Sequence, residues 1–398
     1  MPRQRPPRPE DALARVVLDR YLGLRRGESV TIETWSHALP WARSFVVEAR
    51  RRGAHPSLMV EDELAFFRSL GAVGSPYVPA GHGNLPGRVG AYVYLDGPEE
   101  FPRLLGLPLQ DLDRLLARHD HAWWRAARRS RTRAIRVAVG DSSPTAAMRY
   151  GVDPNAWRAE LVRASLVDPD RLEGSARRLT RRLVRVRRLR VRHPNGTDLL
   201  LERDARPPLV DSGRPDPRAG RIWGRVPSGL LVIPLRGGTA EGTWETNRPA
   251  YNRFTQPPLA VGGRFVFRAG RLTEFTFDRG GAPFAAAYAR AGRGRGRAVA
   301  LTVGLNPAIS HAPEAQELGE GTVGLLLSDA PYRAESRQPR FSFLAALEGA
   351  DVDAEGRAWL AGGRLVPRAG SGSPRGSDPR YDRKRFANAT RKVRASPR

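Results

Sequence analysis

The feature that most constrains this chain is a change in its sequence pattern near residue 185. Before that point, β-rich runs alternate with segments of helical periodicity. The β-rich runs are Ser29–Thr34, His55–Glu61, Ala91–Leu95 and Ile135–Val139. Parallel strands need long crossover connections, which are usually helices, so this alternation predicts a doubly wound, mostly parallel α/β domain. One crossover helix is expected from Pro40 to Arg52, with Gly53 ending it.

Beyond residue 185 the β-rich runs become shorter and are separated by Gly and Pro. Phe265–Phe267 and Leu272–Phe275 flank Gly270, a pattern that predicts a β-hairpin. Similar runs are Leu189–Glu202, Gly229–Pro234 and Thr322–Leu327, and one helix is expected at Pro283–Ala291. The second half is therefore predicted to be a β-rich, antiparallel domain. The fold class is α/β followed by α+β.

These patterns suggest four segments. We expect a disordered basic N-terminus at 1–13, an α/β domain at 14–185, a β-rich domain at 186–366, and a disordered basic tail at 367–398. The tail contains ten Arg or Lys and two Asp, a net charge of +8. The simplest interpretation of the tail is a solvated segment, and the alternative is weak, non-specific contact with nucleic acid.

The whole chain has a net charge of +26, and its only lysines are Lys384 and Lys392. An arginine-rich composition of this kind can arise from codon usage as well as from selection for an anionic partner. A second basic run, Arg171–Arg192, contains ten arginines and changes from helical to strand periodicity. We expect it to form a solvent-facing helix and the edge of a sheet.

Composition excludes several classes of protein. The chain has no cysteine, which rules out disulfide scaffolds, zinc ribbons and thiol nucleophiles, so any metal site must use His and carboxylates. No apolar run approaches the length of a membrane span, and no secretory signal is recognisable. We expect a cytoplasmic protein without a membrane partner.

Several segments, taken in order, resemble the thermophilic aminopeptidase family of metallopeptidases, the aminopeptidase T and aminopeptidase S group. They are Val16–Pro56, Pro144–Trp157, Arg187–Glu202, Ala240–Tyr251, Gly263–Phe275, Val303–Ile309 and Gly321–Val323. The resemblance covers roughly residues 14–366. It implies an N-terminal α/β domain, a β-rich catalytic domain and a homodimer. It also implies a site of two glutamates, two histidines and one aspartate that binds two divalent metal ions and removes N-terminal residues from peptides.

The metal ligands of the family are where this sequence departs from it. Carried across residue by residue, the five ligand positions fall on Gly237, Ala300, Gly324, Phe341 and Phe343. None of these side chains can bind a metal ion, so we expect no metal cofactor. Iron-dependent dioxygenases that share the scaffold need the same His and Asp positions, so the loss argues against that activity as well.

Relocated ligands are the alternative, and the weak candidates are Glu245, His311, Glu317 and Tyr332. A helix over this stretch would place His311, Glu314 and Glu317 on one face, because positions three apart are neighbours. The simpler interpretation is that Ser310 or His311 begins a helix whose first turns favour acidic residues. The remaining histidines, including His37, are scattered without ligand spacing to an acid.

The resulting hypothesis is an aminopeptidase-like pseudoenzyme that acts by peptide or protein binding, or by assembly. One alternative is an active metal-dependent aminopeptidase with relocated ligands. A second is a basic protein associated with nucleic acid, for which steep salt dependence of binding would be the signature.

Overall fold

The computed structural model describes residues 8–73, 82–95, 97–99, 123–250, 260–291, 294–330 and 341–367. The elements described below all belong to one compact unit, residues 1–365. The predicted tail lies outside the described residues apart from Pro367. Helix α1 spans Pro9–Val16 and thus begins within the segment predicted as a disordered N-terminus.

The first sheet has five strands in the order β2-β1-β3-β4-β8, and every neighbouring pair is parallel. Its strands are β1 (Ser29–Trp35), β2 (His55–Glu61), β3 (Ala91–Leu95), β4 (Arg133–Val137) and β8 (Trp223–Val226). Four of them come from the first half of the chain, as predicted. The fifth, β8, comes from the second half and returns to pair with β4.

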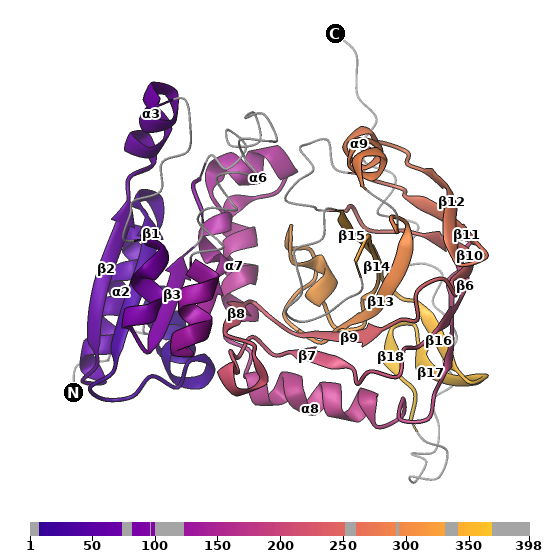
Figure 1. Cartoon of the computed structure of the whole chain (residues 1–398), viewed down its shortest axis with the longest axis horizontal. Helices are drawn as coiled ribbons and strands as arrows, with labels where there is room; N and C mark the ends of the chain where they lie inside the picture. The colour runs from indigo at the N-terminus through magenta and orange to yellow at the C-terminus, as the bar shows by residue number, and fades with distance from the viewer. Residues whose placement is uncertain are drawn as a thin grey trace. The chain divides into compact units, whose positions relative to one another are not determined.

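Helices cover both faces of this sheet, as in a doubly wound domain (Figure 1). The helices of the first half of the chain are α1, α2 (Leu39–Arg51), α3 (Glu63–Val73), α6 (Pro144–Tyr150), α7 (Pro154–Ser165) and α8 (Pro169–Thr180), and a π-helical turn follows α1 at Val17–Tyr21. Of these, α8 packs on the antiparallel sheets and not on the parallel sheet. On one face, α1 and α2 cover Ile32, Val93 and Ile135. On the other face, residues 123–130 form a helix whose Trp123 packs on Tyr92. Alternate strand residues thus face opposite helical layers.

Two antiparallel sheets make up the rest of the unit. The eight-stranded sheet has the order β12-β11-β10-β6-β5-β16-β17-β18, and the five-stranded sheet has the order β15-β14-β13-β9-β7. The eight strands are Arg271–Thr276, Arg264–Arg268, Glu241–Glu245, Asp198–Glu202, Arg188–Arg192, Asp351–Ala354, Arg357–Ala361 and Arg364–Leu365, in that order. The five are Ser342–Leu347, Val323–Ser328, Arg297–Gly304, Leu230–Pro234 and Leu209–Asp211. Helix α9 (Ala282–Arg290) lies between β12 and β13 in the chain.

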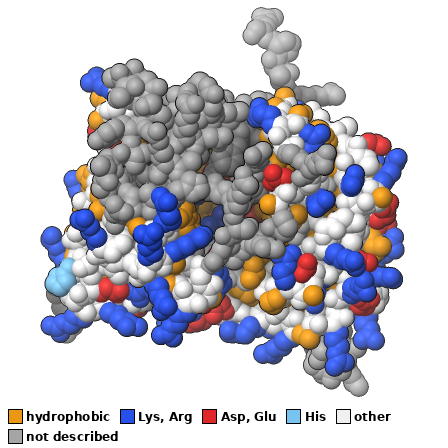
Figure 2. All heavy atoms as spheres, in the orientation of Figure 1, with side chains coloured by type: hydrophobic (Ala, Val, Ile, Leu, Met, Phe, Trp, Pro, Cys, Tyr) orange, Lys and Arg blue, Asp and Glu red, His pale blue; other side chains and the backbone are white. Residues whose placement is uncertain are grey.

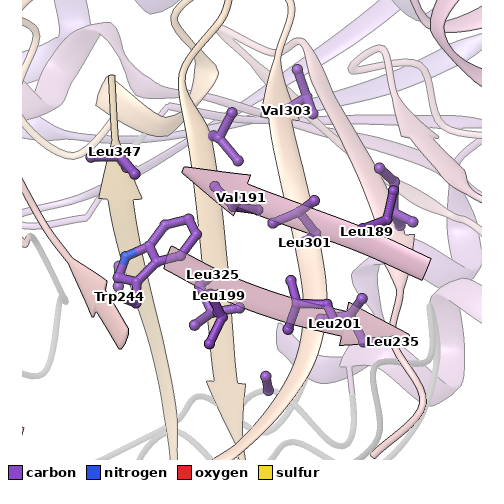
Figure 3. Packing of buried hydrophobic residues seen from close by; sticks show 14 of the residues in the cluster. Leu189, Val191, Leu199, Leu201, Leu235, Trp244, Leu301, Val303, Leu325 and Leu347 are labelled. Carbon is purple, nitrogen blue, oxygen red and sulfur yellow. The ribbon is translucent and has the colours of Figure 1, made fainter. Parts of the chain in front are cut away.

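The two antiparallel sheets pack face to face over a shared apolar core (Figure 3). The eight-stranded sheet contributes Leu189, Leu199 and Trp244, and the five-stranded sheet contributes Leu301 and Leu325. These side chains are almost fully buried, which is the main stabilising term of such a layer. The predicted fold class, a parallel α/β region followed by a β-rich antiparallel region, is therefore confirmed.

The internal basic run forms α8 and β5. Leu189 and Val191 of β5 enter the core, while the alternating arginines are exposed. Of these, Arg190 and Arg192 pair with Asp198 and Asp353 on the neighbouring strands. Arg190 makes a bidentate contact with Asp198 on β6, at 2.7 and 2.6 Å. The expectation of a sheet edge is wrong, because β5 pairs with β6 and β16 on its two sides.

Arginine side chains are spread over the face of the molecule shown in Figure 2, with acidic side chains between them. None of the helices in the described part of the chain combines the length and apolar character that a membrane span needs.

The motif Leu305-Asn306-Pro307 joins the two kinds of layer. The Asn306 side chain is fully buried, and its Nδ2 donates to the carbonyl oxygens of Ala164 and Ser228 at 3.0 and 2.8 Å. Replacing a buried, hydrogen-bonded amide lowers the free energy of unfolding, because truncation leaves the buried carbonyl oxygens without donors. This asparagine therefore ties α7 to the β-rich layers.

Candidate functional site

Two of the five ligand positions lie side by side on the face of the third sheet that points away from the shared core. Ala300 on β13 pairs with Leu326 on β14, and Thr302 pairs with Gly324. Directly paired residues of an antiparallel ladder share a face, as do residues two apart on one strand. We call this surface the far face and define it by Ala300, Thr302, Gly324, Leu326, Ser342 and Leu344.

Phe341 and Phe343 do not join Ala300 and Gly324 on the far face. Phe343 pairs with Leu327 of β14, and both phenylalanines belong to the apolar core. They pack against Phe284 of α9 with ring centroids 5.5 and 4.7 Å apart, in edge-to-face geometry. The residues of this segment that reach the far face are Ser342 and Leu344. Bringing this strand's ligand positions beside Ala300 and Gly324 would therefore require a shift of one residue.

A side chain at position 324 would crowd two neighbouring side chains on the far face. A Cβ added to Gly324 would lie 2.9 Å from Leu344 Cδ1 and still closer to Thr302 Oγ1. Thr302 donates its hydroxyl hydrogen to the Gly324 carbonyl oxygen at 3.3 Å. The fifth position, Gly237, lies in the turn after β9, where a Cβ would meet only Arg297 Cδ at 3.8 Å.

The donor set of the far face does not suit a two-metal site. Carboxylates and imidazoles hold divalent zinc, cobalt or manganese ions in proteins. The far face instead carries Ala300, Gly324, Leu326 and Leu344, with hydroxyl groups from Thr302 and Ser342. Across the described ranges, no three His, Asp or Glu side chains come together in a way that could hold a metal ion. The residues present do not fit the metal centre that the resemblance implies.

The relocated candidates are separated from one another. Glu245 lies on β10 of the eight-stranded sheet, where its carboxylate is 3.1 Å from Arg264 Nε. His311 Nδ1 is 3.1 Å from Arg248 Nη1, and Glu317 Oε1 accepts from Arg225 Nη2 at 2.9 Å. Each of these three side chains thus contacts a different arginine. Tyr332 lies outside the described residues.

The helix expected around residue 311 does not form. His311 lies in a bend, Glu314 has a positive φ of 58°, and Gln316–Leu318 forms a short 3-10 helix. A positive φ at a non-glycine residue cannot continue a right-handed helix, so i, i+3 spacing does not align these acids. The amides of 310–312 are instead bound by the carboxylate of Glu160 on α7.

Charged side chains gather where this turn region meets the parallel sheet. Arg225 on β8 contacts Glu317, and the neighbouring Arg136 on β4 contacts Asp141 at 2.9 Å. Tyr150 on α6 donates its hydroxyl hydrogen to the Glu314 carboxylate. Alternating charges of this kind hold the turn region against β4, β8 and α6.

The Glu314 carboxyl titrates abnormally in this cluster. Burial, followed by the nearby charge of Asp141, raises its pKa above the usual value of 4.5. The hydrogen bond from Tyr150 and the charge of Arg136 oppose that rise. Perturbed carboxyls occur in structural ion-pair networks as well as in active sites. Because the other charged groups here are paired, we interpret the cluster as structural.

Comparisons with known proteins were made for both sequence and structure. No family model matches the sequence, and no curated protein matches it. The fold is similar to that of AmpT from Thermus thermophilus, with a TM-score of 0.67 and 19% identity over 90% of this chain and 99% of AmpT.

The fold is also similar to 2,5-dihydroxypyridine dioxygenase from Pseudomonas putida KT2440. The TM-score is 0.57, with 14% identity over 91% of this chain and 99% of the dioxygenase. At these identities the likeness establishes the fold alone. It confirms the fold that the sequence resemblance implied.

Proposed function

We propose that this chain, which has the fold of AmpT, is a catalytically silent protein that acts by binding a peptide or protein. The observation that carries the proposal is the far face of β13–β15. Its ligand positions carry side chains without metal-binding groups, and the space beside Gly324 is filled by Thr302 and Leu344. Hydrolysis of a peptide bond on this scaffold depends on activated water, which metal-binding carboxylates and imidazoles would have to support.

The alternative of an active aminopeptidase needs a second set of ligands. Glu245, His311 and Glu317 each contact a separate arginine and do not converge. A relocated site would have to break these contacts before it could form. This arrangement favours the silent protein over the relocated enzyme.

A direct test compares peptide hydrolysis with peptide retention. Leucine p-nitroanilide would be incubated with the full chain in the presence of zinc, cobalt or manganese, and AmpT from Thermus thermophilus would be assayed in parallel. We expect no release of p-nitroaniline above the protein-free blank. Equilibrium dialysis with a labelled pentapeptide library should then recover the retained peptides intact.

Release of p-nitroaniline that a chelator abolishes would overturn the proposal and favour relocated ligands. The variants His311→Gln and Glu317→Gln would then identify them. Failure to retain any peptide would overturn the binding role.

A further inference from the structure

A cavity lies at the carboxyl edge of the parallel sheet, and none of the residues given for its lining belongs to the far face. Its volume is about 300 Å³. It is lined by His37, Ala38, Trp41, Glu99, Val139, Gly140, Ser143, Pro144 and Arg158. These residues follow the ends of β1, β3 and β4, except Arg158, which comes from α7.

The position of this cavity in the topology is informative. The chain runs from β1 outward to β2 and then crosses to β3 on the other side of β1, so the winding reverses between β1 and β3. In open α/β sheets, such a reversal opens a crevice at the carboxyl ends of the strands, and ligands bind there. The residues after β1 and β3 line the cavity from the two sides of this crevice.

Two opposite charges line the cavity without pairing. The Arg158 guanidinium donates to the carbonyl and hydroxyl oxygens of Ser142, at 3.1 and 3.4 Å. Within the described part of the chain, no carboxylate lies within ion-pair distance of Arg158, and no cation lies within that distance of the Glu99 carboxylate. Each of these half-buried charged side chains therefore lacks a counter-ion among the described residues, and burial without one is unfavourable.

His37 lines the same cavity, and its ring nitrogens have no hydrogen-bond partner among the described residues. Its side chain is 15% exposed. The nearest carboxylate oxygen, Glu63 Oε2, is 3.9 Å from Nδ1, beyond hydrogen-bond distance. Unpaired buried polar atoms are rare in folded proteins, and a ligand is one way to satisfy them.

We propose that this cavity binds a small zwitterion, an amino acid with free carboxylate and ammonium groups. The carboxylate pairs with Arg158, and the ammonium group pairs with Glu99. An apolar side chain of the ligand packs against Trp41, Ala38 and Val139. One ligand thus satisfies both unpaired charges, whereas a simple anion or a simple cation would leave one of them alone.

The proposal can be tested by isothermal titration calorimetry, which measures the affinity of the full chain for leucine, N-acetyl-leucine and leucinamide. The buffer contains a chelator. N-acetylation removes the ammonium charge, and amidation removes the carboxylate. We expect leucine to bind and each capped analogue to bind at least about tenfold more weakly, because each loses a charge-assisted hydrogen bond.

Two variants test the ammonium end and the carboxylate end of the ligand separately. Glu99→Gln should weaken leucine binding and abolish the discrimination against N-acetyl-leucine. Arg158→Gln should abolish the discrimination against leucinamide. Arg163→Gln, on the exposed side of the same helix, is the matched control and should bind like the wild type.

Absence of leucine binding, or equal affinity for leucine and N-acetyl-leucine, would overturn the proposal. If Arg158→Gln fails to fold because it loses the contacts with Ser142, the Glu99→Gln titrations decide the question. The chelator makes the result independent of whether the far face binds metal.

Discussion

The side chains that looked most like relocated metal ligands are occupied by local contacts. Glu245, His311 and Glu317 each contact an arginine. A carboxylate in an ion pair gives up part of its affinity for a metal, because metal binding must first break that pair. At the scale of single residues, each of these groups has an arginine partner in the structure.

Glu314 provides a test at this scale, because its pKa is raised in the folded state. In the unfolded chain the carboxyl ionises near its usual value of 4.5, whereas in the folded chain it holds its proton to higher pH. The cost of the buried charge is therefore absent below pH 4.5 and fully present above the folded pKa. We expect Glu314→Gln to raise stability at pH 8 by about 1 kcal/mol and to have little effect at pH 4.

Thermal unfolding at the two pH values measures this difference. Glu320→Gln, at an exposed position in the same turn region, is the control and should change little at either pH. A destabilised Glu314→Gln variant at pH 8 would show that the carboxylate gains more from Arg136 and Tyr150 than burial costs it.

The residues that line the cavity were the hardest feature to predict from the sequence. The sequence gives His37 no ligand spacing to an acid, yet in the structure it lines a cavity with Glu99 and lies 3.9 Å from Glu63. The one available signal was its place two residues after β1, at the edge where parallel strands end. Glu99 and Arg158 reach the same cavity from far along the chain, and no spacing rule connects them.

The bounds of several secondary structure elements agree closely with those predicted from the sequence. The strands expected at His55–Glu61 and Ala91–Leu95 have those bounds in the structure, and the helix expected at Pro40–Arg52 spans Leu39–Arg51. Hydrophobic periodicity, with Gly and Pro at the ends, determines elements of this kind locally. Which face a strand residue takes depends on its partner strand, so the opposite orientations of Ala300 and Phe343 could not be read from the sequence.

Substituting the two glycines that occupy metal-ligand positions of the family tests how tightly their surroundings are packed. A Cβ at Gly324 would crowd Thr302 and Leu344, whereas a Cβ at Gly237 would make only an ordinary contact with Arg297. We expect Gly324→Ala to lower the free energy of unfolding by about 1–3 kcal/mol, the usual cost of overpacking. Gly237→Ala should stay within about 0.5 kcal/mol of the wild type.

Urea denaturation of the two variants measures these changes. Combining Gly324→Ala with Leu344→Ala should recover part of the loss, because it removes one of the crowded neighbours. Equal stability of both single variants would mean that the far face has room for a larger side chain at 324.

At the scale of the whole molecule, the fold is retained at low sequence identity. The chain matches AmpT over 90% of its length at 19% identity, and the same scaffold is similar to a dioxygenase. Packed layers depend on apolar pattern and volume, which many sequences supply, whereas a metal centre depends on a few particular side chains. The predicted homodimer, the domain limits at 185 and 366 and the role of the +26 charge remain predictions.

We propose that the far face binds no divalent metal ion. The most direct measurement is the metal content of the full chain after incubation with zinc, cobalt and manganese and removal of free ions, with a chelator-washed sample as control. We expect near-zero stoichiometry for all three metals. One or two ions retained per chain would contradict it, and their loss in His311→Gln or Glu317→Gln would locate the ligands.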